Sequence, residues 1–248
     1  MRSANRFSRF PVRLVQRAAL ALATLLLAPS AFAGGFDQCV DVALVLALDG
    51  SDSVDAREYQ LQQQAIAYAL RDREVLNAFA RAGTVAVAVI VWGDARHPVD
   101  DIDAVTIRDG RDAERLARAV ERQPRRARGT TGLGAGLAAA LNRLTAMGCA
   151  HRSVVNVSGD GKETIMPRRQ RIEETAEQAR NRAQAWDVTI NALVISGATP
   201  GLARYYAQKI ITGPEAFVME IASYDDINQA LKRKLMREVA PAMVSWAD

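Results

Sequence analysis

The chain has 248 residues, 49% of them hydrophobic and 24% charged, which is enough for one sizeable domain with a full core. Its net charge of +4 comes from 32 basic and 28 acidic residues, but five of the arginines lie in the first 17 residues. Without these five, 27 basic residues stand against 28 acidic ones, a net charge of −1, which excludes a generally basic protein that binds nucleic acid.

The N-terminal segment has the pattern of an export signal. Residues 1–17 carry five arginines and no acidic residue, and residues 18–27 form an apolar run. Ala31 and Ala33 are small residues at the positions that a signal peptidase reads, so we expect cleavage after Ala33. The alternative is an uncleaved membrane anchor, but the apolar run is shorter than the roughly 20 residues that a bilayer span needs.

Cleavage there divides the chain into a signal peptide, residues 1–33, and a mature domain, residues 34–248. No later apolar stretch is long and charge-free enough to cross a membrane. We therefore expect the mature domain to be exported to the periplasm or the medium, without a membrane span.

The mature chain alternates apolar runs with amphipathic stretches. Near-continuous apolar runs are typical of strands buried on both faces, and we expect them at residues 40–48, 84–92, 153–157, 188–195 and 216–221, with a short edge strand at 104–107. Apolar residues at helical spacing predict helices at 54–71, 112–122, 171–186, 201–211 and 225–239, and one from the glycine-rich turn 129–136 to about 147. This alternation predicts a doubly wound α/β domain: a mostly parallel six-strand sheet with helices on both faces.

Three segments rich in oxygen-bearing side chains follow or separate these strands. Asp49, Ser51 and Ser53 come directly after the first strand, and Asp160 comes after the third buried run. The glycine-rich turn between them carries two threonines at the start of a helix. Because ligands of a doubly wound sheet bind outside the carboxyl ends of its strands, we expect these side chains to share one edge of the sheet.

The donors in these segments are carboxylate and hydroxyl oxygens. Hard oxygen ligands suit Mg²⁺, our first choice, or Mn²⁺ or Ca²⁺, and not zinc or copper. Alternate residues of a tight turn can point the same way, so Asp49, Ser51 and Ser53 can converge on one divalent cation. The alternative is a helix N-cap, in which Ser53 or Asp55 starts the next helix without any ion.

The same segments resemble the metal-ion-dependent adhesion site of the von Willebrand factor A family. That site reads Asp-x-Ser-x-Ser, then a Thr in a glycine-rich turn, then Thr-Asp-Gly, and this chain has an extra glycine before the last Asp. The matching positions are Asp49, Ser51, Ser53, Thr131 and Asp160. The resemblance implies that the two serines and Thr131 bind the ion directly and the two aspartates mostly through water. It also implies an open coordination position for an acidic residue of a protein partner.

Residues 55–80 and 205–239 resemble an uncharacterised family of exported bacterial A-like domains, catalogued as a domain of unknown function. The likeness extends over nearly all of the mature chain. It implies the fold and names no activity.

The two cysteines, Cys39 and Cys149, stand just before the first strand and the third buried run. An even pair in an oxidising compartment suggests a disulfide, and the alternative is two small buried thiols. In the A-like fold that the resemblance implies, these two strands are parallel neighbours. We therefore expect a Cys39–Cys149 disulfide at the edge of the sheet opposite the metal site.

The site favours a binding module and not an enzyme. We expect a divalent cation that accepts a carboxylate from a protein partner; the alternative is a structural or assembly module whose ion only stabilises loops. The enzymatic alternative is a metal-assisted phosphohydrolase with Asp49 as nucleophile. Such enzymes usually have a second acidic residue two positions later, where this chain has Ser51, which disfavours this alternative. Only two histidines are present and no Gly-x-Ser-x-Gly elbow, which disfavours a serine hydrolase.

Basic residues flank the glycine-rich turn. Arg125, Arg126 and Arg128 precede it and could steer an acidic partner by long-range attraction. The alternative, which we favour, is a solvated loop surface balanced by aspartates such as Asp94 and Asp100. We interpret Asp94, which follows the second strand, as a turn residue.

Overall fold

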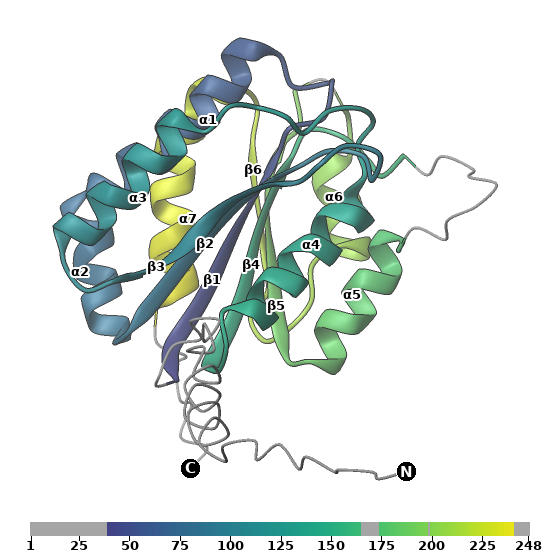
Figure 1. Ribbon diagram of the computed structural model, residues 1–248. Coiled ribbons are helices and arrows are strands. Elements are labelled where there is room, and N and C mark those ends of the chain that lie inside the picture. Colours follow the sequence, from purple (N-terminus) through teal and green to yellow (C-terminus); the bar gives the residue numbers. More distant parts are fainter. Residues whose placement is uncertain (1–38, 165–173, 198, 241–248) are drawn as a thin grey trace, which may run out of the picture. The chain divides into compact units, whose positions relative to one another are not determined.

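The strands form one sheet of six in the computed structural model, which describes residues 39–164, 174–197 and 199–240. The sheet order is β3-β2-β1-β4-β5-β6 (Figure 1). The strands are β1 (Val40–Asp49), β2 (Val85–Trp92), β3 (Asp100–Ile107), β4 (Ala150–Gly159), β5 (Val188–Ile195) and β6 (Val218–Ile221). Neighbouring strands run parallel, except that β3 runs antiparallel to β2. The predicted mostly parallel six-strand sheet is confirmed.

Helices cover both faces of the sheet (Figure 1). One face carries α1 (Ala56–Arg71), α2 (Arg73–Ala82), α3 (Gly110–Arg122) and α7 (Ile227–Val239), and α1 contacts both α3 and α7. The other face carries α4 (Leu133–Ala146), α5 (Ala176–Ala185) and α6 (Leu202–Lys209). A 3-10 turn, η1 (Tyr224–Asp226), links β6 to α7. The doubly wound α/β fold that the sequence predicts is confirmed.

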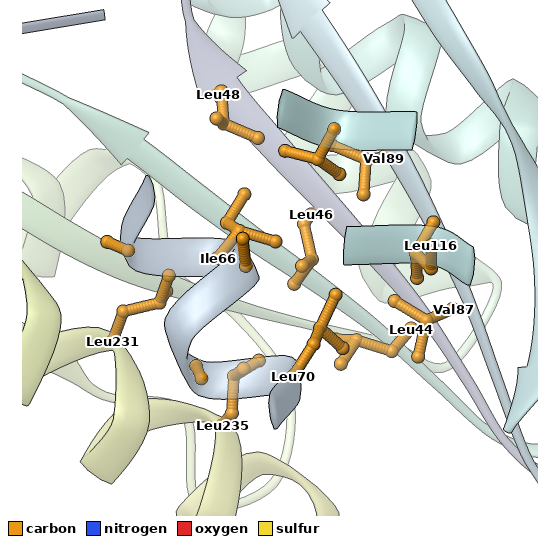
Figure 2. Packing of buried hydrophobic residues seen from close by; sticks show 14 of the residues in the cluster. Leu44, Leu46, Leu48, Ile66, Leu70, Val87, Val89, Leu116, Leu231 and Leu235 are labelled. Atoms are coloured by element: carbon orange, nitrogen blue, oxygen red, sulfur yellow. The ribbon is translucent and has the colours of Figure 1, made fainter. Parts of the chain in front are cut away.

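The central strand β1 is buried on both faces, as its continuous apolar run predicts. Successive side chains of a strand point to opposite faces, so β1 contributes to two cores. Leu44 and Leu46 pack on the α1 side, and Figure 2 shows them beside Ile66 and Leu70 of that helix. The alternate residues, Val45 among them, join the core beneath α4 and α5. Burial on both faces holds β1 firmly, which gives the loop after it a rigid base.

Several elements differ from the prediction. Strand β4 begins at Ala150 instead of Ser153, and α5 begins at Ala176, while residues 171–173 of the helix predicted there lie outside the described residues. Residues 73–82 form helix α2, which we did not predict. Asp72 both ends α1 and begins α2. Its N–H donates to the Ala69 carbonyl at the end of α1, and its carboxylate accepts from the N–H groups of Glu74 and Val75 at the start of α2. The edge strand β3 begins at Asp100 instead of Ala104. Strand pairing begins early because Asp100 is fully buried and is satisfied by hydrogen bonds from another segment.

The predicted disulfide is present. Cys39 and Cys149 are joined, with their Cα atoms 4.7 Å apart. They lie just before β1 and β4, which are parallel neighbours, and the Val40 N–H donates to the Cys149 carbonyl at 3.2 Å. The bond therefore connects the starting ends of the two central strands.

The predicted signal peptide, residues 1–33, lies outside the described residues. Among the helices that are described, none combines the length and apolarity that crossing a bilayer requires.

Candidate metal centre

The loop after β1 folds back on itself and brings its polar side chains together. One carboxylate oxygen of Asp49 accepts the Ser51 N–H at 2.8 Å, and the hydroxyls of Ser51 and Ser53 lie 3.1 Å apart. The turn stays close to β2 because the Gly50 N–H donates to the Trp92 carbonyl at 2.7 Å. A Cβ atom on Gly50 would lie 2.7 Å from a methyl group of Val91, so only glycine fits there.

The end of β4 meets this loop directly. The Ser53 hydroxyl donates to a carboxylate oxygen of Asp160 at 2.7 Å, which joins residues 107 positions apart in the chain. A Cβ atom on Gly159 would lie 2.3 Å from the Tyr206 hydroxyl oxygen and 3.4 Å from Asp49 Oδ2. The extra glycine before Asp160 therefore leaves room for the Asp49 carboxylate and the tyrosine beside β4.

The glycine-rich turn supplies the third segment. A Cβ atom on Gly161 would lie 2.9 Å from the Thr131 hydroxyl oxygen, so this hydroxyl sits against the residue that follows Asp160. The Thr131 carbonyl accepts the Thr164 N–H at 2.9 Å. On its other side the turn contacts the first loop, where the Asp52 N–H donates to the Gly129 carbonyl at 2.8 Å. The structure thus brings all three predicted segments to one edge of the sheet.

The burial of the five side chains is graded. Asp49 and Ser51 are fully buried and Thr131 is nearly so, whereas Asp160 is partly exposed and Ser53 is exposed. The site is therefore closed on the side of the sheet and open to solvent on the side of Ser53. A group from another molecule can approach from that side.

Asp49 has an unsatisfied buried oxygen. Its Oδ2 has no hydrogen-bond partner among the described residues, although buried polar atoms in folded proteins are almost always paired. Burial, followed by repulsion from Asp160, raises the pKa of Asp49 to about 7. A cation beside this oxygen would relieve both costs, so the donor set fits a divalent ion.

The chemistry of the donors selects the class of ion. Within the described parts of the chain, no three histidine, cysteine, aspartate or glutamate side chains gather in a way that could hold a metal. The five side chains instead offer two carboxylates and three hydroxyls. Such a set suits Mg²⁺, Mn²⁺ or Ca²⁺.

Two residues that the sequence analysis did not single out support the site from below. Gln62 of α1 donates to the Asp49 carbonyl at 2.9 Å and accepts from the Ser158 hydroxyl at 3.2 Å, which ties the ends of β1 and β4 together. One carboxylate oxygen of Glu163 accepts the N–H groups of Gly134 and Ala176, in the first turns of α4 and α5. The sequence could have indicated Gln62, because it is a polar residue on the buried face of a predicted helix.

Two tyrosines lie beside the carboxylates. The Tyr206 hydroxyl donates to the Gly161 carbonyl at 3.1 Å. The Tyr224 hydroxyl is buried and has no partner among the described residues. Burial, and after it the charges of Asp160 and Asp49, raise the pKa of Tyr224 above its ordinary value, which places its ring in the electrostatic field of the site.

The basic residues before the turn are not simply a solvated surface. Arg126 pairs with the fully buried Asp100, and the Arg125 guanidinium donates to carbonyls of the loop after β1. The third arginine, Arg128, is exposed, and its side chain has no hydrogen bond or ion pair with the residues that the structure describes. Asp94 is a buried turn residue that accepts hydrogen bonds from the Arg96 N–H and guanidinium and contacts the ring of His97.

Comparison with known families gives one match. A family described as "Protein of unknown function (DUF1194)" matches residues 38–243. No curated protein matches the chain.

Solved structures with a similar fold include a matrix protein of the mussel byssus, a pilus adhesin and a minor pilin. Proximal thread matrix protein 1 from the mussel byssus matches with a TM-score of 0.52 and 15% identity, over 80% of this chain and 46% of that one. The pilus adhesin SpaC from Lactobacillus rhamnosus GG matches with a TM-score of 0.56 and 14% identity, over 82% of this chain and 31% of its own. The minor pilin PilB from Streptococcus sanguinis matches with a TM-score of 0.58 and 10% identity, over 83% and 64%.

These likenesses identify a von Willebrand factor A-like fold. One structure of the mussel protein, with a TM-score of 0.54 and 15% identity, has a zinc-occupied metal-ion-dependent adhesion site. The chain spans less than two thirds of the length of each of these proteins. At such low identities the comparison supports the fold alone.

Proposed function

The chain belongs to the DUF1194 family of proteins of unknown function, and we propose from its candidate metal centre that it is an exported module that binds another protein through a divalent cation. Ser51, Ser53 and Thr131 would hold the ion directly, and Asp49 and Asp160 would hold it through water. A bound cation would supply an open coordination position for a carboxylate of the partner.

The observation that carries this proposal is the unsatisfied Oδ2 of Asp49. A buried carboxylate oxygen without a donor is destabilising, and folded proteins keep such groups mainly where they have a task. Here the orphaned oxygen lies where three loops meet, next to a second carboxylate that raises its pKa. Binding of a cation explains why the chain tolerates both.

We further propose that residues 1–33 are the signal peptide and residues 34–248 the mature A-like domain. Export agrees with the Cys39–Cys149 disulfide, because disulfides persist in oxidising compartments. It also agrees with the similarity in fold to a pilus adhesin and a minor pilin.

Titration of the mature domain with Mg²⁺, Mn²⁺ and Ca²⁺ tests the metal centre. We expect binding to a single site in isothermal calorimetry and its loss in Asp160→Ala, which removes the carboxylate that accepts from Ser53. Asp52→Ala is the matched control, because Asp52 is an exposed aspartate of the same loop whose side chain has no hydrogen bond or ion pair among the described residues. An Asp160→Ala protein that binds the ions as tightly as the wild type would contradict the assignment.

Capture of partners from the native envelope tests the binding function. The immobilised domain in Mg²⁺ buffer should retain a protein that a chelator elutes, and Asp160→Ala should retain none. Capture that is unaffected by both the chelator and the substitution argues against a partner held through the ion.

One observation favours a second function, that of a structural or assembly module. The Ser53–Asp160 and Asp52–Gly129 hydrogen bonds already join the loops without an ion. In that case Mg²⁺ would raise the melting temperature but would leave capture of any partner unchanged. The phosphohydrolase alternative is tested by assaying phosphatase turnover with Mg²⁺ or Mn²⁺; robust activity that Asp49→Asn abolishes would replace both proposals.

A further inference from the structure

Arg125 lies in the segment between α3 and the Thr131 turn, and its guanidinium reaches across to the loop after β1. It donates to the carbonyls of Gly50 at 3.0 Å, Ser51 at 2.6 Å and Val54 at 2.7 Å. The guanidinium carbon also lies 5.7 Å from the centre of the Tyr59 ring. One side chain therefore holds these three main-chain acceptors, and it also reaches a fourth, the Asp55 carbonyl, at 3.5 Å.

The geometry of these contacts is specific to arginine. A guanidinium is planar and has five N–H donors in a fixed fork, so it can serve several carbonyls that diverge from one point. A lysine ammonium is a single point donor on a flexible stem and cannot span the same three acceptors. The hydrogen bonds of Arg125 go to main-chain carbonyls, so they constrain the path of the loop independently of its side chains.

The segment that carries Arg125 is itself anchored. The next residue, Arg126, donates its N–H at 2.8 Å and its side chain Nε at 2.6 Å to the fully buried Asp100 carboxylate. The Ala127 N–H donates to the same carboxylate at 3.2 Å. Arg125 therefore projects from a fixed base toward the loop.

Electrostatics excludes simple attraction of the ion as the role of Arg125. Its positive charge lies beside the loop that would bind a cation, and like charges repel. What Arg125 contributes is the shape of the loop.

We propose that Arg125 is a positioning residue that holds the loop after β1 in its metal-binding form, a role that rests on the proposed metal-dependent function. Because Arg125 and Thr131 lie on one segment, this contact also fixes the position of the loop after β1 relative to the turn that carries Thr131. Without Arg125 the loop populates other conformations, and the apparent metal affinity falls with the fraction that remains competent to bind.

The test uses Arg125→Lys and Arg125→Gln in the full mature domain. The matched control is Arg128→Gln, which makes the same change of charge three residues away, at an exposed side chain without a described partner. Mn²⁺ and Mg²⁺ affinities are measured by calorimetry. Hydrogen exchange of the amides of residues 50–55 is measured in chelator.

We expect both Arg125 variants to lose about 10- to 100-fold in metal affinity, the range found when residues that support metal ligands are replaced. Exchange of residues 50–55 should accelerate in chelator, while exchange in the distant helix α5 stays as in the wild type. Arg128→Gln should match the wild type in both measurements.

The outcomes separate the two proposals. Unchanged affinity and unchanged loop exchange in Arg125→Lys overturn the role of Arg125, and so does exchange that rises evenly over the whole domain. A wild-type protein that binds no ion overturns the metal proposal instead. The exchange measurement in chelator still decides, in that case, whether Arg125 orders the loop.

Discussion

At the scale of single residues, the two carboxylates of the candidate metal centre repel each other when no cation is present. Asp49 is fully buried and lacks a partner for Oδ2, and the negative charge of Asp160 adds to the cost of ionising it. Residues arranged for binding at the expense of stability are a common property of functional sites. The same arrangement predicts how the protein responds to loss of one charge.

Asp160→Asn should separate stability from metal binding. The amide oxygen can still accept from the Ser53 hydroxyl, but the repulsion on Asp49 disappears. In chelator we expect the variant to melt at the wild-type temperature or above it. In Mg²⁺ at about 100 times Kd, the wild type should gain about 2.7 kcal/mol of stability and the variant should gain none.

Thermal unfolding of both proteins, with and without Mg²⁺, measures this difference. Asp52→Asn serves as the control, since it removes an exposed charge from the same loop. The prediction would be contradicted if Asp160→Asn melted at a lower temperature than the wild type in chelator. It would also be contradicted if Mg²⁺ stabilised the variant as much as it stabilises the wild type.

The sequence identified the five side chains of the candidate site because their pattern is local: an aspartate and two serines in alternation, a threonine in a glycine-rich turn and an aspartate after a strand. Whether they hold an ion stays a prediction. The contact of Arg125 with the loop after β1 was not predicted, because its acceptors are main-chain carbonyls, whose positions depend on the fold and not on residue identity. Arg126 was also interpreted as part of a solvated surface, because the sequence does not show that its partner, the carboxylate of Asp100, is fully buried.

At the scale of elements, helix α7 carries an ion pair inside the core. Lys234 and Glu238 are one helical turn apart, both are buried, and they contact each other. Glu238 also accepts a hydrogen bond from Asn156 of β4 at 2.8 Å. Burial lowers the pKa of Lys234 to about 8 and raises that of Glu238. The pair therefore ties α7 to the sheet at a cost in desolvation.

Lys234→Met should destabilise the protein by about 3–5 kcal/mol, because it leaves the Glu238 carboxylate buried without a cationic partner. In the double variant Lys234→Met/Glu238→Gln no charge remains, and the amide oxygen still accepts from Asn156. Most of the lost stability should return. Urea unfolding at neutral pH measures both, and a double variant less stable than the single one would refute this account of the pair.

The elements that the sequence predicted well are those with one dominant signal. The buried strands β1, β2 and β5 are marked by apolar runs, and their bounds agree with the structure within a residue. Helix α2 was missed because Asp72 ends one helix and begins the next without a break between them. The start of β3 was missed because it is polar, and its burial depends on Arg126 from a distant segment.

At the scale of the whole molecule, the disulfide closes a long segment. Cys39 and Cys149 are 110 residues apart, so the bond removes much of the freedom of the unfolded chain. Replacing both cysteines with serine should reduce the free energy of unfolding by about 2–5 kcal/mol. Metal affinity should be unchanged, because the site lies at the opposite ends of β1 and β4.

Denaturant unfolding and calorimetry on the same double variant test both statements. The wild type under oxidising and reducing conditions provides the comparison. Equal stability of the two proteins, or a loss of Mg²⁺ affinity in the variant, would contradict the prediction.

The position of the disulfide also determines how the domain would respond to mechanical load. A partner bound at the proposed metal centre would pull along β1 and β4, whose opposite ends are joined by the Cys39–Cys149 disulfide. Force applied to the chain at Cys39 would therefore be shared by the two central strands, so that β1 would not separate from the sheet alone. Under tension, the non-covalent grip on the partner should yield before the sheet does.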